Sequence, residues 1–560
     1  MLQPCASLTF LDPACGSGNF LTETYISLRH LENDVLNELQ RGQIVLSDAA
    51  NSPIQVSIGQ FYGIEINDFA VTVAKTALWI AESQMMKETE VIVHMQLDYL
   101  PLKTYANIVE GNALRMDWET VVPKHKTSYI MGNPPFVGYS NQNETQKADI
   151  LAVYVDENSK PFKTAGKIDY VAAWYYKAAQ FMSGMQIRAA FVSTNSITQG
   201  EQVSSVWKPL YDMFSIHIDF AHRTFKWNSE ATEKAAVHCV IIGFSGAGNR
   251  NTEKALYSGE RKRIVANINP YLVDAPNVFI ESRGTAICDV PVMVYGNKPT
   301  DGGHLFFDAT EYEEFIAKEP NAVKYVRKIY GATEYINNID RYCLWLVDAD
   351  PSELKKMPLV MERIEKVRQF RLSSPKKATQ DSAATPTLFQ EIRQSEREYI
   401  IVPRHSSENR RYIPFGFVDS SIVVNDAVLM IPGATLYHFG ILTSNVHMAW
   451  VRVVCGRIKS DYRYSKDIVY NNFPWPDITD EQKKQIGQLA QIILDVRAQF
   501  PKSSLSDIYD DRVMPSALLN AHRELDRAVM KLYEFSVKDT DEAACVAALM
   551  ERYKAMTVDK

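Results

Sequence analysis

The chain has 560 residues, a formal net charge of −7 and an apolar content of 46%. This length allows about two to four domains, and the composition is ordinary for a globular protein. The acidic balance argues against a protein that coats nucleic acid along its whole surface. A local basic face can still bind DNA, so the positions of the basic residues matter more than the net charge.

No apolar run is long enough to cross a bilayer, and the N-terminus has no basic, apolar and small-residue leader. We therefore expect a cytoplasmic protein. The seven cysteines are widely spread, and none pairs with another at metal-ligand spacing. We expect neither a bound metal nor a disulfide framework.

The first predicted element is a strand over residues 8–11, which ends at Asp12 and leads into a loop of small residues. Apolar residues at helical spacing then predict a helix from Phe20. Gly16 and Gly18 lie in the loop and let the backbone come close to a ligand at the N-terminus of that helix. A pair of glycines does not identify which ligand binds there.

The next predicted strand, over residues 60–67, carries Glu65 near its end. A carboxylate at the end of a core strand can accept both hydroxyls of a ribose, although a surface acid is the plain alternative. Glu65 follows Asp12 by more than the roughly 20 residues usual in nucleotide-binding folds, which indicates an inserted hairpin over residues 43–58. A helix over residues 68–86 and a strand with its loop over residues 108–114 follow.

An apolar run over residues 129–131 leads into Asn133, Pro134, Pro135 and Phe136. The two prolines stiffen the loop after the predicted strand. The Asn133 amide and the Pro134 carbonyl can both accept hydrogen bonds from one planar amino group, and Phe136 offers a stacking face. The pattern predicts a site for a planar substrate with an exocyclic amine. An ordinary turn is the alternative, because Asn-Pro and Pro-Pro commonly form turns.

Further alternation of apolar segments predicts a helix from about residue 168 and strands over residues 189–193 and 237–244. Residues 1–245 are thus expected to form an α/β domain with a mainly parallel sheet. Residues 225–228 (Phe-Lys-Trp-Asn) could stack on a base or could be an ordinary connecting loop. Residues 245–251 have the composition of a linker.

Residues 246–476 carry three clusters of basic side chains. Residues 355–377 alone contain eight basic residues and two acidic ones, a local balance of +6. One such cluster is usually a solvated face, but three in one region indicate phosphate contacts and base reading. The predicted DNA-binding residues are Arg368, Arg371, Lys376, Lys377, Arg404, Arg410, Arg411, Lys459, Arg463 and Lys466.

Residues 477–560 are expected to form a helical domain. Thr479 and Gln482 have capping-box spacing at the start of one amphipathic helix, and a second helix is predicted over residues 515–535. Packing against the neighbouring domain is the expected role of both helices, with contact to DNA or a partner as the alternative.

The two loops around Asp12 and Asn133 together resemble those of S-adenosylmethionine-dependent amino-methyltransferases of DNA. The resemblance implies a class I (Rossmann-like) methyltransferase fold with S-adenosyl-L-methionine as cofactor. Asn133, Pro134, Pro135 and Phe136 would then be the catalytic residues. The implied cofactor-binding residues are Asp12, Ala14, Cys15, Gly16, Gly18, Asn19, Phe20, Glu65, Ile66, Asn112 and Ala113. Asn112 stands where related enzymes often carry Asp, so the charge at this position is lost.

The order of the motifs, with the cofactor loop first and a basic region last, resembles the γ arrangement of adenine methyltransferases. Segments 193–202, 220–225 and 470–476 resemble the MmeI-like (type IIL) group, and the resemblance extends over essentially the whole chain. It implies site-specific methylation of adenine in duplex DNA within a restriction-modification or phage-defence system. The tetrad alone leaves the cytosine amino group open.

In the MmeI-like group a nuclease, a helical spacer and a motif that helps to close the cofactor pocket precede the methyltransferase. The chain starts about ten residues before the cofactor loop, so we expect a separately encoded nuclease or N-terminal portion as a possible partner. Two other functions stay open. One is a non-catalytic DNA-binding component, and the other is a methyltransferase for protein glutamine side chains, although those enzymes are small and lack a large basic C-terminal region.

Overall fold

A computed structural model describes residues 2–40, 54–94, 106–227, 237–249 and 253–557. The chain forms two compact units, Met1–Phe279 and Ile280–Lys560. Within the described part of the chain, no helix combines the length and the apolar character needed to cross a bilayer.

The first unit is built on a nine-stranded sheet with the strand order β3-β2-β1-β4-β5-β7-β6-β8-β9. The five strands from β3 to β5 pair in parallel, and β7 joins β5 in the antiparallel direction. The strands are β1 (Phe10–Asp12), β2 (Phe61–Glu65), β3 (Asn107–Glu110), β4 (Tyr129–Gly132), β5 (Arg188–Thr194), β6 (His217–Trp227), β7 (Val237–Ser245), β8 (Lys254–Ser258) and β9 (Arg261–Val265).

The order of the parallel strands reverses between β1 and β4. Successive strands run from β1 outward to β2 and β3, and the chain then returns to β4 on the other side of β1. In open α/β sheets, ligands bind at such a switch point, beyond the carboxyl ends of the strands. The loops after β1 and β4 are the two loops that the sequence singles out.

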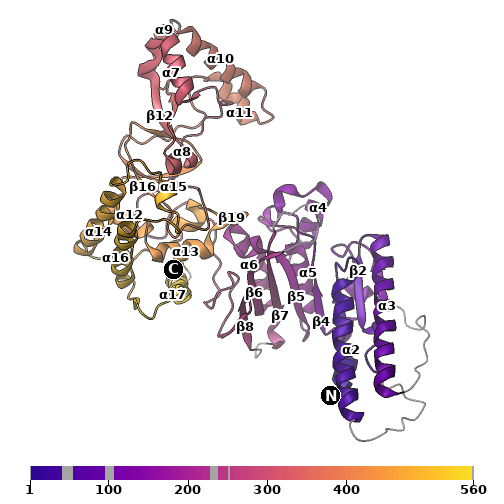
Figure 1. Cartoon of the computed structure of the whole chain (residues 1–560). Coiled ribbons are helices and arrows are strands. Elements are labelled where there is room, and N and C mark those ends of the chain that lie inside the picture. Colours follow the sequence, from indigo (N-terminus) through magenta and orange to yellow (C-terminus); the bar gives the residue numbers. More distant parts are fainter. Residues whose placement is uncertain (1, 41–53, 95–105, 228–236, 250–252, 558–560) are drawn as a thin grey trace. The chain divides into compact units, whose positions relative to one another are not determined.

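Helices cover the sheet of the first unit. Figure 1 shows α2 and α3 side by side near β2, and their apolar residues share one core with β1, β2 and β3. On α5, the buried Tyr175 stacks on Phe244 of β7 at a centroid distance of 5.3 Å. The helices are α1 (Leu2–Ser7), α2 (Asn19–Gln40), α3 (Asp68–Val93), α4 (Glu144–Val153), α5 (Ala172–Met182) and α6 (Gly200–Phe214).

The α/β architecture expected for the first unit is confirmed, with three differences in detail. Residues 225–227 belong to β6, so the expected loop is wrong there, and residue 228 lies outside the described residues. Most of the expected hairpin over residues 43–58 also lies outside them, and residues 58–60 form a short 3₁₀ helix. The sheet continues into β8 and β9, so the expected division at residue 245 falls inside this compact unit.

The second unit contains three small sheets with the orders β10-β18-β14-β16, β11-β13-β12-β17 and β15-β20-β19. The strands are β10 (Val294–Tyr295), β11 (Phe306–Asp308), β12 (Val326–Tyr330), β13 (Arg341–Leu344), β14 (Tyr399–Pro403), β15 (His405–Ser406), β16 (Gly416–Val418), β17 (Val423–Val424), β18 (Val428–Pro432), β19 (Gly456–Ile458) and β20 (Asp461–Arg463).

Eleven helices accompany these sheets in the described part of the second unit. They are α7 (Ala309–Lys318), α8 (Ala332–Asn337), α9 (Pro351–Leu354), α10 (Pro358–Leu372), α11 (Lys377–Asp381), α12 (Leu436–Leu442), α13 (Asn445–Val454), α14 (Asp480–Ala498), α15 (Leu505–Ile508), α16 (Ser516–Leu532) and α17 (Glu542–Thr557). The capping box predicted at Thr479 and Gln482 is present at the start of α14. The mixed α+β region and the helical C-terminal segment are therefore both observed.

Candidate active site

The loop between β1 and α2 forms a glycine cradle at a helix N-terminus. Gly16 and Gly18 have φ angles of +53° and +83°, in the left-handed region that glycine tolerates best. A Cβ on Gly18 would lie 3.0 Å from the Cβ of Ala74 on α3. A side chain at residue 18 would thus be strained and would press against α3, so the loop packs closely only with glycine.

Asp12 lies at the end of β1 and is almost fully buried, with 1% of its surface exposed. Its Oδ1 accepts a hydrogen bond from the Ala14 amide at 3.0 Å, and a Cβ on Gly132 would lie 2.4 Å from the same atom. Burial raises the pKa of Asp12 to about 7, the Ala14 hydrogen bond opposes this, and the negative charge of Glu65 adds to it. A cationic ligand beside Asp12 would favour its ionised form.

Glu65 at the end of β2 joins two loops. Its Oε2 accepts from the Gly16 amide at 2.9 Å, and its Oε1 accepts from the Asn67 amide at 3.0 Å. A carboxylate has about four acceptor sites, so these bonds leave capacity for ribose hydroxyls. Glu65 is therefore tied to the glycine cradle, which a plain surface acid would not be.

The other residues predicted for the cofactor surround this cradle. Cys15 is buried, its amide donates to the Ile64 carbonyl at 3.1 Å, and burial raises the pKa of its thiol. Asn19 and Phe20 begin α2, where Asn19 is exposed and Phe20 is half-buried. Ile66 follows Glu65 with 67% of its surface exposed, so it is accessible to a ligand.

Asn112, in the loop after β3, has a charged neighbour that the sequence did not reveal. Its Nδ2 donates to Oδ2 of Asp149 on α4 at 3.0 Å, and its Oδ1 accepts from the Leu114 amide at 2.9 Å. Asp149 is 2% exposed and also accepts from Arg115 Nε at 2.6 Å and from the Tyr170 hydroxyl at 3.0 Å. A carboxylate therefore lies next to residue 112, where the resemblance implied one in the side chain itself. The sequence around Asn112 gives no signal for this contact, because Asp149 lies 37 residues further along the chain.

Asn133 lies directly after β4 and carries a buried acceptor. Among the described residues, none donates a hydrogen bond to its Oδ1. Leaving a buried acceptor without a donor costs roughly 1–3 kcal/mol, which a ligand amine could offset. Pro134 is buried, Pro135 is exposed and Phe136 is half-buried. The oxygen that the sequence predicts as an amine acceptor is thus available for that role.

The chain is similar to known proteins along its whole length. Family models for the MmeI DNA-methyltransferase domain, target recognition domain and C-terminal domain match residues 1–258, 274–477 and 478–559. The solved structure of the type IIL restriction-modification enzyme MmeI in complex with DNA matches with 46% sequence identity and a TM-score of 0.88, over 100% of this chain and 74% of that chain. The chain belongs to the MmeI family.

A curated relative of this MmeI-family chain is DNA methyltransferase A of Bacillus subtilis (strain 168), which is 40% identical over 560 residues. The chain spans 62% of the length of that relative. The relative therefore contains a large part that this chain does not match.

The ten residues predicted to bind DNA all belong to the second unit, but they differ in exposure. Three are half-buried: Arg404, Arg410 and Lys466. Six are exposed: Arg368, Lys376, Lys377, Arg411, Lys459 and Arg463. Several of these also pair locally, as Lys377 does with Asp381 at 2.9 Å. Exposed ion pairs are weak, so this pairing leaves the lysine free to move to a phosphate.

Arg371 on α10 is a correction to the predicted DNA-binding set. The side chain is 0% exposed, and its guanidinium donates to five backbone carbonyls at 2.7–3.0 Å. An arginine has five N–H donors, so none remains for a phosphate. Arg371 holds together the loops around α10, and its carbonyl partners are those of Pro299, Thr300, Ser382, Thr385 and Leu388.

Segment 470–476, which carries part of the resemblance to this family, has a structural role. The Tyr470 hydroxyl donates to the Pro291 carbonyl at 2.6 Å, and Asn471 Nδ2 donates to the Arg283 carbonyl at 2.7 Å. Asn472 Nδ2 donates to the Glu281 carbonyl at 3.0 Å. The segment therefore fixes the strand-free stretch 281–291 at the start of the second unit.

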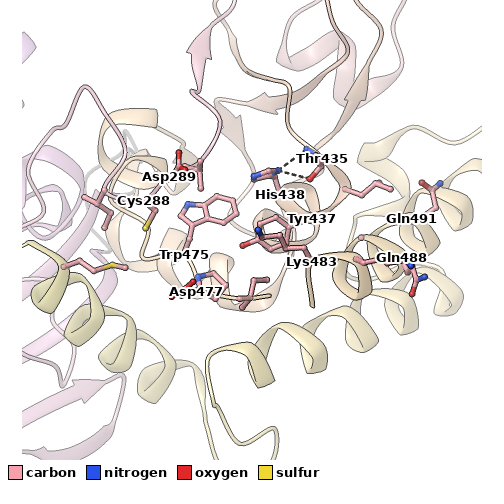
Figure 2. Close-up of a pocket in the computed structure, with 18 residues that line it drawn as sticks. Cys288, Asp289, Thr435, Tyr437, His438, Trp475, Asp477, Lys483, Gln488 and Gln491 are labelled. Atoms are coloured by element: carbon pink, nitrogen blue, oxygen red, sulfur yellow. Dashed lines mark hydrogen bonds between the residues drawn. The ribbon is translucent and has the colours of Figure 1, made fainter. Parts of the chain in front are cut away.

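A cavity of about 1060 Å³ lies in the second unit between α12 and α14. Figure 2 shows Trp475, Tyr437 and His438 in its wall, with His438 bonded to Thr435. Burial, with a smaller effect of Lys483, lowers the pKa of His438 to about 4, so the ring is neutral at physiological pH. The residues that line the cavity, all in the described part of the chain, include none of those predicted for cofactor or DNA.

Proposed function

We propose that this chain transfers a methyl group from S-adenosyl-L-methionine to the exocyclic amino group of adenine at a specific site in duplex DNA. The observation that carries the proposal is the buried Asn133 Oδ1 without a donor, which lies after β4 while the glycine cradle lies after the adjacent β1. An amine acceptor and a nucleotide cradle on neighbouring strands of a switch point suit the transfer of a group from a nucleoside cofactor to an amine. Membership of the MmeI family supports the same activity.

In this proposal the cofactor is held by the residues around the first two strands. S-adenosylmethionine, when bound, supplies a methyl group on a positively charged sulfonium. The Asp12 carboxylate and the amides around Gly16 and Gly18 would hold the methionine end, and Glu65 would accept the ribose hydroxyls. Asn112 and Ala113 would border the adenine of the cofactor, with Asp149 fixing the orientation of the Asn112 amide.

The target base would have to leave the DNA stack to reach Asn133. Asn133 Oδ1 and the Pro134 carbonyl would accept the two amino hydrogens, which draws the lone pair of the nitrogen out of conjugation with the ring. Phe136 would stack on the base. No covalent intermediate on the enzyme is needed, so the protein contributes positioning and electrostatics.

DNA binding is assigned to the predicted basic residues of the second unit other than Arg371, all within residues 368–466, and the C-terminal helices support that region. The solved MmeI structure contains DNA, which supports this assignment. We further propose that the chain acts within a restriction-modification system. A separately supplied nuclease or N-terminal portion is the expected partner.

The test is methyl transfer from labelled S-adenosylmethionine to unmethylated genomic DNA, with sequencing of the modified bases. We expect label on adenine at one repeated motif. Replacement of Asn133 by Ala should lower the rate of methyl transfer by about 10²-fold or more, because the amine loses the acceptor that orients it. Binding of cofactor and of DNA should stay nearly unchanged.

Three other results would each give a different answer. Label on cytosine would keep the chemistry and change the base. Label on glutamine side chains of added protein would assign the activity to another substrate class. A folded chain that binds DNA and transfers no methyl group would be a non-catalytic DNA-binding component, and the proposed activity would be wrong.

A further inference from the structure

One segment at the start of α5 contacts two loops of the candidate active site directly and is linked to the third through Asp149. The Trp174 indole donates to the Pro13 carbonyl in the cofactor loop at 3.0 Å. The Tyr170 hydroxyl donates at 3.0 Å to Asp149, which in turn accepts from Asn112. Asp169 contacts the loop that follows Phe136. Three nearby residues on one segment are therefore linked to three different loops, Tyr170 through Asp149 and the other two directly.

Asp169 contacts the backbone of the loop after β4, which is the loop that carries Asn133. Its Oδ1 accepts from the Tyr139 amide at 3.0 Å, three residues after Phe136. Its Oδ2 accepts a hydrogen bond from the Ser196 hydroxyl, which also lies 2.9 Å from Thr194 Oγ1 at the end of β5. Asp169 is 8% exposed. One buried carboxylate thus joins the loop after β4 to the end of β5.

Backbone contacts on both sides reinforce this connection. The Tyr170 amide donates to the Val137 carbonyl at 2.9 Å, and Gln142 Nε2 donates to the Ile168 carbonyl at 2.9 Å. The Asp169 amide itself donates to Gln202 on α6 at 3.1 Å. Asp169 is therefore itself held by Gln202 of α6 and by Ser196 after β5. The loop after β4, in contrast, has no strand or long helix over residues 133–142.

We propose that Asp169 is a positioning residue for the transfer reaction: it fixes the loop that carries Asn133, Pro134 and Phe136 in the geometry that the target amine requires. This inference rests on the proposed function. The loop after β4 has to hold the amine in line with the methyl donor, so it tolerates little displacement. An error of about 1 Å in the position of the amine can reduce the rate by about 10²-fold. Asp169 does not itself touch the base.

The decisive comparison is between Asp169→Ala and Asp169→Asn. Alanine removes both acceptors and releases Tyr139 and Ser196. Asparagine keeps an oxygen for the Tyr139 amide, and its NH₂ can donate to Ser196 Oγ, whose hydrogen can turn to Thr194. Position is thus preserved in Asp169→Asn while the negative charge is lost, so the pair separates a positional role from an electrostatic one.

We expect Asp169→Ala to lower kcat by about 10²-fold with the KM for S-adenosylmethionine changed by less than about 3-fold. Asp169→Asn should keep kcat within about 10-fold of the wild type. Asp169→Ala should still extrude the target base, because extrusion does not need the alignment that Asp169 provides. The fluorescence of 2-aminopurine at the target position measures this extrusion. Unchanged kcat in Asp169→Ala, or equal losses in both variants, would overturn the proposal.

Two further variants keep the test specific. Asp156→Ala is the control, because Asp156, like Asp169, accepts two hydrogen bonds; its donors are the Asn158 and Lys160 amides, both at 2.9 Å, in a turn outside the site. It should leave kcat unchanged, and an equal loss there would overturn the proposal. Should Asp169→Ala fail to fold, Ser196→Ala removes one partner of Asp169 and should lower kcat several-fold at constant KM; no loss of kcat would contradict the role.

The control for the proposed function is the wild-type chain beside Asn133→Ala. Transfer by the wild type and none by Asn133→Ala keeps the proposed function whatever Asp169 does. A wild-type chain that transfers no methyl group would overturn the proposed function and this inference together.

Discussion

At the scale of single residues, Asp12 combines burial with a place in the candidate cofactor site. Its pKa of about 7 lies above the ordinary value of 3.8, so the unfolded chain loses this proton at lower pH than the folded chain. The contribution of Asp12 to folding stability is therefore complete below pH 4 and is lost as the pH rises to about 7. Ionised Asp12 is tolerated best when a cation lies beside it.

This linkage gives a pH dependence for cofactor binding. If the cationic methionine end binds beside Asp12, binding favours the ionised carboxylate, so affinity should rise with pH. We expect the Kd for S-adenosylmethionine to fall roughly 5- to 10-fold between pH 6 and pH 7.5. Isothermal titration calorimetry at several pH values measures this. In Asp12→Asn the profile should be flat over that range, and a slope equal to that of the wild type would assign the effect to another group.

At the scale of elements, α10 shows how one helix can mix two roles. The sequence 355–377 is a basic run, and the structure folds most of it into α10 with Val360, Ile364 and Val367 buried on one face. Arg371 lies on that buried face, four residues after Val367, and Arg368 lies exposed. Helical periodicity thus sorts neighbouring arginines of the same run into a structural residue and a surface residue.

Replacing these two arginines should have very different effects on stability. Arg371→Ala removes the donor of five backbone carbonyls and leaves a cavity at a buried site, so it should lower the free energy of unfolding by about 3 kcal/mol or more. Arg368→Ala should change it by about 0.5 kcal/mol or less, because its pair with Glu365 is exposed. Urea denaturation of both variants checks this. Similar stabilities of the two variants would contradict the structural role of Arg371.

Sequence patterns predicted most elements of the first unit, with errors where tertiary pairing decides. The helix expected over residues 68–86 is α3 and runs on to Val93, because its apolar face continues to pack. Residues 225–227 look like a loop in the sequence, yet they pair with β7 as the end of β6. Pairing with a distant strand is not visible in local composition.

At the scale of the whole molecule, the net charge of −7 contrasts with the basic residues exposed on the second unit. Exposed charges act over about one Debye length, roughly 8 Å at physiological salt. Phosphate contacts therefore depend on the charges close to the DNA and not on the net charge of the chain. An acidic protein can therefore bind DNA through clusters of exposed basic residues. Removal of the basic residues should weaken binding to all sequences alike.

The salt dependence of DNA binding tests this assignment. Lys376→Ala combined with Lys377→Ala should reduce the slope of log K against log salt by about 1–2, since each lost phosphate contact contributes about 0.9. The matched control replaces Lys483 and Lys484, which are also adjacent and exposed but lie on α14 outside the predicted set. An equal change of slope in both double variants would argue against a specific basic face.

The family, the α/β architecture and the two loops of the candidate site could all be predicted from the sequence, because each motif is contiguous and lies where an apolar strand ends. The tertiary structure alone decided the partners of those loops. The hydrogen bond of Asp149 to Asn112, that of Asp169 to the loop after β4 and those of the buried Arg371 to the Pro299 and Thr300 carbonyls each join residues tens of positions apart, and no local pattern encodes such contacts. They arise only when strands and helices pack and buried polar groups must find partners.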